Sequence, residues 1–100
     1  MKRISLPNRD ALMRVFSYDA QSGILERKYN PEVPSRTNKQ FAGRRAGTPA
    51  RGFVRTLAYG QLYYAHLIIW KMFHGQEPGR LRHINGDRSD NRISNLEEIQ

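Results

Sequence analysis

The chain of 100 residues is long enough for one small domain with a single modest core and too short for two. Lysine and arginine number 17 against 9 acidic residues, and this net charge of +8 is mostly arginine, which grips phosphate groups and favours a nucleic-acid partner over an inert basic surface. The absence of cysteine excludes disulfides and thiolate chemistry, and without an apolar run of membrane-spanning length or a signal peptide we expect a soluble cytoplasmic protein with no membrane partner.

Residues 1–28 predict a short helix followed by a reversal of the chain. Asn8 is the expected N-cap, and apolar residues from Leu12 onward recur at i, i+3 and i+4 on one face of the helix. Turn-forming residues then lead to a second apolar run, so residues 16–28 are expected to form a hairpin or a corner between helix and strand. Prolines and asparagines interrupt every period in residues 29–40, where we expect a flexible loop.

Residues 41–75 are expected to form a small sheet and a central helix. Two segments rich in β-branched and aromatic residues, 52–57 and 61–65, are separated by a glycine-containing turn and predict a β-hairpin. The run 66–74 is almost entirely apolar, which predicts a buried helix, and Gly75 is a natural stop.

A basic, glycine-containing loop precedes this hairpin. Arg44, Arg45 and Arg51 lie within residues 43–52, and Arg55 follows on the next strand. Glycine lets a backbone approach a duplex closely, so the loop is expected to contact phosphate groups. A solvated loop without a partner is an equally open interpretation of the same residues.

The last segment, residues 78–100, alternates apolar residues with turn-forming polar ones. The run Asn85 to Asp87 predicts a tight turn, and Asp90 or Asn91 can accept hydrogen bonds from nearby backbone N–H groups. His83 is therefore expected at the end of a short strand that leads into a rigid polar loop.

His83 is the candidate for chemistry in this segment. Hydrolysis of a phosphodiester needs a base to activate water, and a neutral imidazole suits that role when a neighbour fixes its tautomer. The side chain of Asn95 is a candidate for that neighbour, and a divalent cation with oxygen ligands would stabilise the developing charge. From the residues alone, a structural turn histidine and a general base both remain open.

The string from Arg82-His83-Ile84-Asn85-Gly86-Asp87 through Asn95-Leu96 resembles the core of phage-type HNH endonucleases. The approach through residues 63–78 and the N-terminal residues 16–25 are also similar to that family. The resemblance implies an α+β fold in which a small antiparallel sheet and a buried central helix precede a C-terminal ββα-metal finger. The family activity is metal-dependent hydrolysis of DNA phosphodiester bonds.

The resemblance also implies roles for individual residues. His83 matches the general base of the family, and Asn95 matches the asparagine that orients it. Double-stranded DNA is the implied substrate, and Mg²⁺ or another divalent cation is the implied cofactor. Support of the loop is expected from Asn85, Asp87, Asp90 and Asn91. Contacts to DNA are expected from Arg44, Arg45, Arg51, Arg55, Arg82, Arg88 and Arg92.

Two features depart from the family pattern. Arg82 stands where the family usually has an acidic metal ligand, and a guanidinium repels a cation and cannot ligate it. The last signature residue of the family, His or Asn, lies on a helix after Asn95-Leu96, whereas this sequence stops at Gln100. The finger is therefore expected to lack its last helix, and its metal ligands are unknown.

The sequence thus predicts a single HNH-like domain over residues 1–100, acting in a bacterial or phage-infected cell. The leading function is hydrolysis of DNA. The alternative is a non-catalytic phage accessory factor that uses the same scaffold to bind DNA or a host protein, and a third interpretation is an RNA-binding protein that uses exposed tyrosines and arginines.

Overall fold

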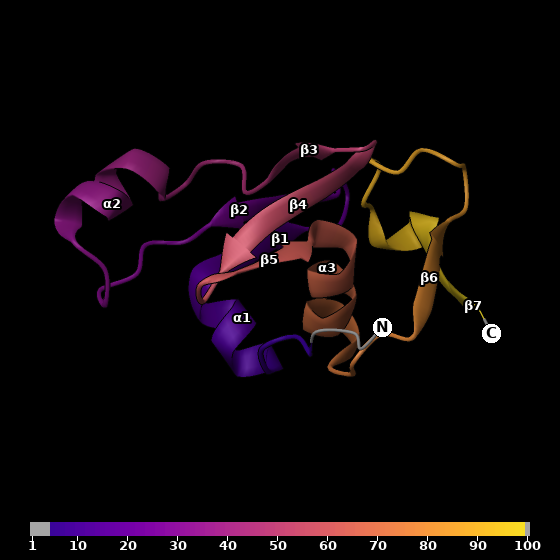
Figure 1. The fold of residues 1–100 in the computed structure, drawn as a ribbon, viewed down its shortest axis with the longest axis horizontal. Coiled ribbons are helices and arrows are strands. Elements are labelled where there is room, and N and C mark those ends of the chain that lie inside the picture. The colour runs from indigo at the N-terminus through magenta and orange to yellow at the C-terminus, as the bar shows by residue number, and fades with distance from the viewer. Residues whose placement is uncertain (1–4, 100) are drawn as a thin grey trace.

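The structure is a computed structural model that describes residues 5–99. Three α-helices, one short 3₁₀ turn and three small antiparallel sheets make up this part of the chain, so the predicted α+β fold class is confirmed. The molecule is elongated, with extents of 42 × 27 × 24 Å. Helix α2 lies at one end and the C-terminal strands lie at the other (Figure 1).

The N-terminal helix and hairpin form as the sequence predicts. Helix α1 spans Arg9–Val15, and the side chain of Asn8 accepts a hydrogen bond from the backbone N–H of Ala11 at 2.8 Å, which satisfies one of the free amides of the first turn. Strands β1 (Phe16–Asp19) and β2 (Ile24–Arg27) then pair antiparallel. Residues 16–28 are therefore a hairpin.

The prediction of a flexible loop over residues 29–40 is wrong in its second half, where helix α2 spans Ser35–Phe41. The helix has no apolar stripe, and Asn38 is its one buried residue. Its side chain accepts from the backbone N–H of Asn30 at 2.7 Å and donates to the carbonyl of the same residue at 2.8 Å. A polar contact between segments thus holds this helix, and hydrophobic periodicity carries no signal for such a contact.

The central sheet has the strand order β3-β4-β5, with bounds Thr48–Ala50, Phe53–Ala58 and Gln61–Tyr64. The β4–β5 hairpin is confirmed, but the basic loop contains an unpredicted third strand. Residues Arg51 and Gly52 both have positive φ, 53° and 85°, as a two-residue type I′ turn requires. The arginine-bearing stretch is therefore a β-ribbon with a tight turn.

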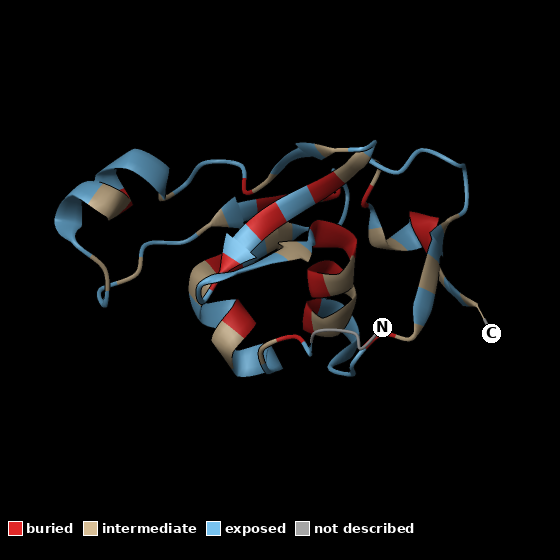
Figure 2. Ribbon diagram, viewed as in Figure 1, coloured by how far each residue is buried: buried red, intermediate tan, exposed pale blue. Residues whose placement is uncertain are grey.

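Helix α3 (Ala65–His74) is the centre of the core, as predicted, and it ends at Gly75 in the left-handed conformation with φ 76°. Ile68 and Ile69 are fully buried on it. Burial in Figure 2 concentrates on α3 and on the strand and helix that face it. The buried apolar residues are Leu6, Leu12, Phe16, Leu25, Ala46, Val54, Ala58, Ala65, Ile68, Ile69, Met72 and Leu96.

The C-terminal finger consists of strand β6 (Arg80–His83), a long polar loop, a 3₁₀ turn (Ile93–Asn95) and strand β7 (Leu96–Ile99). The strands pair antiparallel with His83 opposite Leu96, which is buried in the core. This register fixes the position of the His83 imidazole at the end of the β6–β7 pair. None of the helices within residues 5–99 is long and apolar enough to cross a membrane.

Replacing Ile68 by alanine is expected to lower the free energy of unfolding by about 2–5 kcal/mol, because a fully buried side chain leaves both lost contacts and a cavity. Leu62→Ala is the control, since Leu62 is 50% exposed and its loss should change stability by about 0.5 kcal/mol or less. Urea denaturation followed by circular dichroism measures both. Equal losses for the two variants would contradict the position of α3 in the core.

Candidate active site

His83 is the last residue of β6 and lies half-buried at the edge of a hollow of about 320 Å³. The hollow is also lined by Phe53, Leu81, Arg82, Gly86 and Arg88. An ionisable imidazole, two guanidinium groups and an aromatic ring therefore face one concave surface. This is a suitable environment for a phosphate group and the water that would attack it.

The imidazole of His83 is held by Asn91, whose Oδ1 lies 2.8 Å from Nε2. Asn91 is 4% exposed, so its side chain is fixed by its surroundings. Among residues 5–99, the second ring nitrogen, Nδ1, has no hydrogen-bonding partner. One nitrogen is thus anchored and the other is available for proton transfer.

Asn95 does not contact the imidazole, contrary to the role predicted for it. Its Oδ1 accepts a hydrogen bond from the backbone N–H of Asn85, and its Nδ2 donates one to Oδ1 of the same residue, each at 3.0 Å. Its Nδ2 also donates to the carbonyl of Asp90 at 2.9 Å. Asn95 therefore closes the loop that carries Asn91, and Asn91 takes the contact with the base.

The two aspartates of the loop are occupied by internal bonds. Asp90 accepts from the guanidinium of Arg92 at 2.9 and 2.8 Å and from Asn85 at 2.9 Å. The Arg92 hydrogen bonds hold the pKa of Asp90 well below its usual range. Asp87 accepts from the N–H and the hydroxyl of Ser89, which lowers the pKa of this carboxyl. Both carboxylates support the loop.

The predicted DNA-binding arginines fall into different environments. Arg82 forms an ion pair with Glu97 across the β6–β7 pair at 2.9 Å, and Arg92 pairs with Asp90. Arg88 forms no ion pair among residues 5–99. Its guanidinium lies 4.8 Å from the centre of the Phe53 ring. Arg88 is therefore a cation beside His83 that an incoming phosphate can use.

The remaining arginines lie on the β-ribbon and beside β2. The carbonyl of Arg51, in the β3–β4 turn, accepts from Arg88 at 3.5 Å, so the ribbon reaches the finger loop as Figure 1 shows. Arg55 is exposed on the outer face of β4. Arg44 and Arg45 lie next to β2 instead, where the carbonyl of the first accepts from the backbone of Arg27 and the second bridges Glu26.

Two aromatic rings, those of His66 and Phe53, lie close to the ring of His83, and the sequence does not predict these contacts. The ring of His66, 7% exposed at the start of α3, lies 4.9 Å from that of His83, centre to centre. Phe53 lies 6.1 Å from His83 and 5.5 Å from His66. An aromatic residue at a strand start is indistinguishable from a core residue in the sequence, so no local signal predicts this contact.

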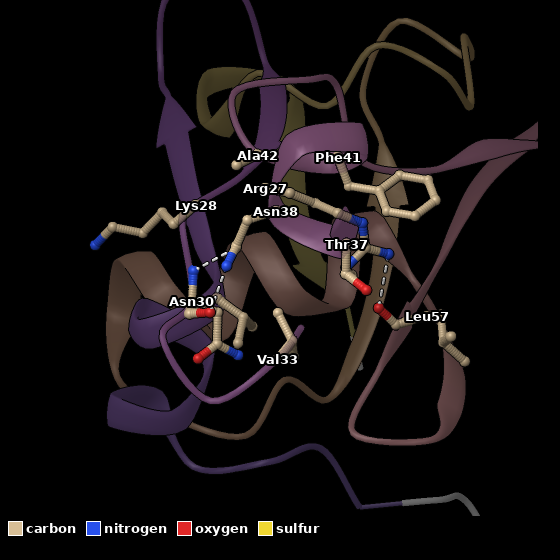
Figure 3. Close-up of a pocket in the computed structure, with 10 residues that line it drawn as sticks. Arg27, Lys28, Asn30, Val33, Thr37, Asn38, Phe41, Ala42 and Leu57 are labelled. Carbon is tan, nitrogen blue, oxygen red and sulfur yellow. Dashed lines mark hydrogen bonds between the residues drawn. The ribbon is translucent and has the colours of Figure 1, made fainter. Parts of the chain in front are cut away.

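A larger hollow, of about 370 Å³, lies between α2 and the hairpins and is mainly apolar (Figure 3). Its polar groups are used internally. Arg27 donates to the hydroxyl of Thr56 and the carbonyl of Leu57, while Asn30 and Asn38 bind one another. Lys28 also lines this hollow, and its amine donates to the carbonyl of Met13 at 2.9 Å. Because the lining includes no imidazole and no carboxylate, the hollow at His83 is the better candidate for chemistry.

The residues around His83 do not fit a divalent cation bound by protein ligands alone. No group of three or more His, Asp or Glu side chains is gathered for metal binding within residues 5–99. Arg82 occupies the strand position beside the base, and Glu97 is engaged by it. Asp90 has both oxygens bonded to Arg92. Asp87 is then the one carboxylate of the loop without an ion pair among residues 5–99, and a single carboxylate does not supply the shell of a hard cation.

Residues 63–100 match the family model described as HNH endonuclease. The match begins in β5 and runs through α3 and both finger strands, so the resemblance to HNH-type proteins is confirmed for this part of the chain. It makes the chain similar to a nuclease family whose members bind nucleic acid and generally use divalent metal ions. No significant match is found among curated proteins or solved structures.

The stability of the finger loop is expected to depend on the ionised form of Asp90. Because its pKa is lowered in the folded protein, its contribution is present above the ordinary aspartate pKa of about 3.9 and is lost as the pH falls through the folded value. Asp90→Asn should lower the melting temperature at pH 6, and the gap to the unaltered protein should narrow below about pH 4. A gap independent of pH would contradict the Asp90–Arg92 pairing.

Proposed function

We propose that this chain hydrolyses phosphodiester bonds in double-stranded DNA with His83 as the general base. The observation that carries the proposal is the bond from Nε2 of His83 to buried Asn91, beside a hollow that also holds Arg82 and Arg88. The match of residues 63–100 to HNH endonucleases supports the same assignment.

The proposed reaction uses the chain's own groups for proton transfer and charge. Nδ1 of His83 takes a proton from a water molecule, whose oxygen attacks phosphorus. Negative charge then grows on the phosphoryl oxygens, where the guanidinium of Arg88 would stabilise it. The bond to the leaving oxygen breaks, and that oxygen takes a proton from solvent. The imidazolium returns its proton to water.

Mg²⁺ is the cation we propose for the assay, because phosphate oxygens of the substrate can complete the shell of a hard cation that the protein alone does not bind. The residues around His83 do not supply this shell, so no step of the reaction above passes through the ion.

The second candidate is a nucleic-acid- or protein-binding module without catalysis. The Arg82–Glu97 ion pair favours it, since it puts a cation where the family has an acidic ligand and engages the neighbouring carboxylate. In this case the scaffold and its basic surface persist, and the partner is DNA or a host protein.

Removing the base is expected to abolish cleavage. His83→Ala should reduce nicking of supercoiled DNA in the presence of Mg²⁺ by about 10²–10⁴-fold, the usual contribution of a general base. His74→Ala is the matched control, because His74 is exposed at the far end of α3 and packs on Trp70, 4.1 Å away.

If the His83→Ala variant still cleaved DNA as fast as the unaltered protein, the proposal would be contradicted. Duplex binding without cleavage in Mg²⁺ or Mn²⁺ would favour the binding module. Cleavage rates measured on duplex DNA, single-stranded DNA and duplex RNA under the same conditions identify the class of substrate.

Arg88 is expected to contribute one phosphate contact. In a titration against a DNA duplex, log affinity falls as log salt rises. Arg88→Ala should make this fall less steep, reducing the magnitude of the slope by about 0.9. Arg36→Ala removes the same charge from α2, at the opposite end of the molecule, and should leave the slope nearly unchanged (Figure 1). Equal changes for both variants would show a diffuse charge effect instead of a contact.

A further inference from the structure

We infer that the N-terminal hairpin positions the base: Asn91 sets the tautomer of His83, and Tyr18 and Gly23 hold Asn91 in place. The inference rests on the proposed role of His83. Residues 16–28 lie outside residues 63–100, the segment that matches the HNH family model, so that match does not assign them this function.

The first step follows from hydrogen-bonding chemistry. The Oδ1 atom of an asparagine can only accept a hydrogen bond, so the contact of 2.8 Å requires Nε2 of His83 to carry the proton. In the neutral ring, Nδ1 then holds the lone pair. Asn91 therefore selects the one tautomer in which Nδ1 can act as a base.

The second step concerns the backbone of Asn91. The hydroxyl of Tyr18 donates to its carbonyl at 2.5 Å, across 73 residues of sequence. Tyr18 is half-buried, and burial raises the pKa of its phenol to about 12, so the hydroxyl keeps its proton over the whole physiological range. Side chain and backbone of Asn91 are thus both bonded, one to the base and the other to the hairpin.

The third step is a close approach of two backbones. A Cβ atom at Gly23 would lie 2.4 Å from the amide nitrogen of Arg92 and 2.7 Å from the carbonyl carbon of Asn91. Both contacts are to main-chain atoms, which have no rotamer to move away. The hairpin turn therefore fits against the loop only with glycine at this position, and it limits the displacement of Asn91 from that side.

The tautomer is measured directly by ¹⁵N chemical shifts of the histidine rings, with His83 assigned from the spectrum of His83→Gln. At about pH 9, where histidine is ordinarily neutral, the unaltered protein is expected to show the Nε2–H form. Asn91→Leu removes the acceptor and should give a mixture with the Nδ1–H form, whereas Asn91→Asp keeps an acceptor and should retain Nε2–H. An unaltered protein with the Nδ1–H form, or an Asn91→Leu spectrum unchanged at His83, overturns the inference.

The role of the hairpin is tested by removing one hydroxyl. Tyr18→Phe should increase amide exchange in the finger loop by up to about tenfold and shift the His83 signals toward those of Asn91→Leu. Tyr59→Phe is the control, since its hydroxyl also donates to a backbone carbonyl, that of Ala11, at 2.8 Å. If Tyr18→Phe leaves the His83 spectrum as Tyr59→Phe does, the hairpin has no positioning role.

A pair of glycine variants tests the backbone approach. Gly23→Ala and Gly60→Ala carry the same strain, with φ of 76° and 79°, but a Cβ at Gly60 meets no atom within 4 Å. Only Gly23→Ala should disturb the His83 ring signals. Should Gly23→Ala fail to fold, Tyr18→Phe decides the question.

Kinetics separates this inference from the proposed function. Asn91→Leu is expected to lower kcat on the order of a hundredfold while KM changes less than about threefold, because the altered group acts on the base rather than on binding. Cleavage that depends on His83 but is unaffected by Asn91→Leu overturns the inference alone. A protein that cleaves nothing, yet loses its Nε2–H form in Asn91→Leu, contradicts only the proposed function and supports the positioning geometry.

Discussion

The side chain of Asn95 is the constraint on which the finger depends. Strands β6 and β7 have four residues each, too few to be stable as an isolated pair. The loop between them has little apolar content, so it cannot fold by burial. Asn95, only 5% exposed, bonds Asn85 twice and Asp90 once, which turns a polar segment into a closed ring of hydrogen bonds. Its partners are the exposed Asn85 and the half-buried Asp90, so loss of the amide would cost about 0.5–1.5 kcal/mol for each hydrogen bond.

Ion pairs within the finger leave few guanidinium groups available to bind phosphate. Arg82 and Arg92 are each neutralised by a carboxylate of the finger, whereas Arg88 rests on Phe53 and the ribbon. The net charge of +8 therefore overstates the number of guanidinium groups that can bind phosphate at the site. Arginines in surface ion pairs contribute little to stability. Exchange of Arg82 from Glu97 to a phosphate would accordingly cost the fold little, whereas Arg92 is held by Asp90 within the loop.

Much of the fold can be predicted from the sequence, and there are physical reasons why some elements were predicted and others were not. The stripe of α1, the apolar run of α3 and the β4–β5 hairpin are local patterns, and all three are confirmed. Helix α2 was not predictable in this way, because a bond from Asn38 to Asn30 holds it. At the site, the motif predicts His83 as the base and its polar neighbours as loop support. The structure places Asn85, Asp87 and Asp90 in hydrogen bonds within the loop. The motif did not reveal that Asn91 holds the ring, because the motif alone does not distinguish which amide of the loop faces the imidazole. Nor did it reveal that Phe53 and Tyr18 approach from distant strands, since contacts across 30 or more residues leave no local pattern.

The dependence of the finger on distant segments also explains why its chemistry cannot be judged from the motif alone. The motif supplies the imidazole, but a base is useful only when its tautomer and position are fixed to within a fraction of an ångström. In this chain that precision would come from a glycine turn and a phenol in the first quarter of the sequence, and from an aromatic ring at the start of β4. Arg82 and Glu97 form a neutral pair beside the base, so the carboxylate of Glu97 does not repel a phosphate approaching His83. Asp87 accepts only from Ser89 and keeps its negative charge near the imidazole. The guanidinium of Arg88, in the hollow beside His83, is therefore the charge that offsets Asp87 when a polyanion approaches.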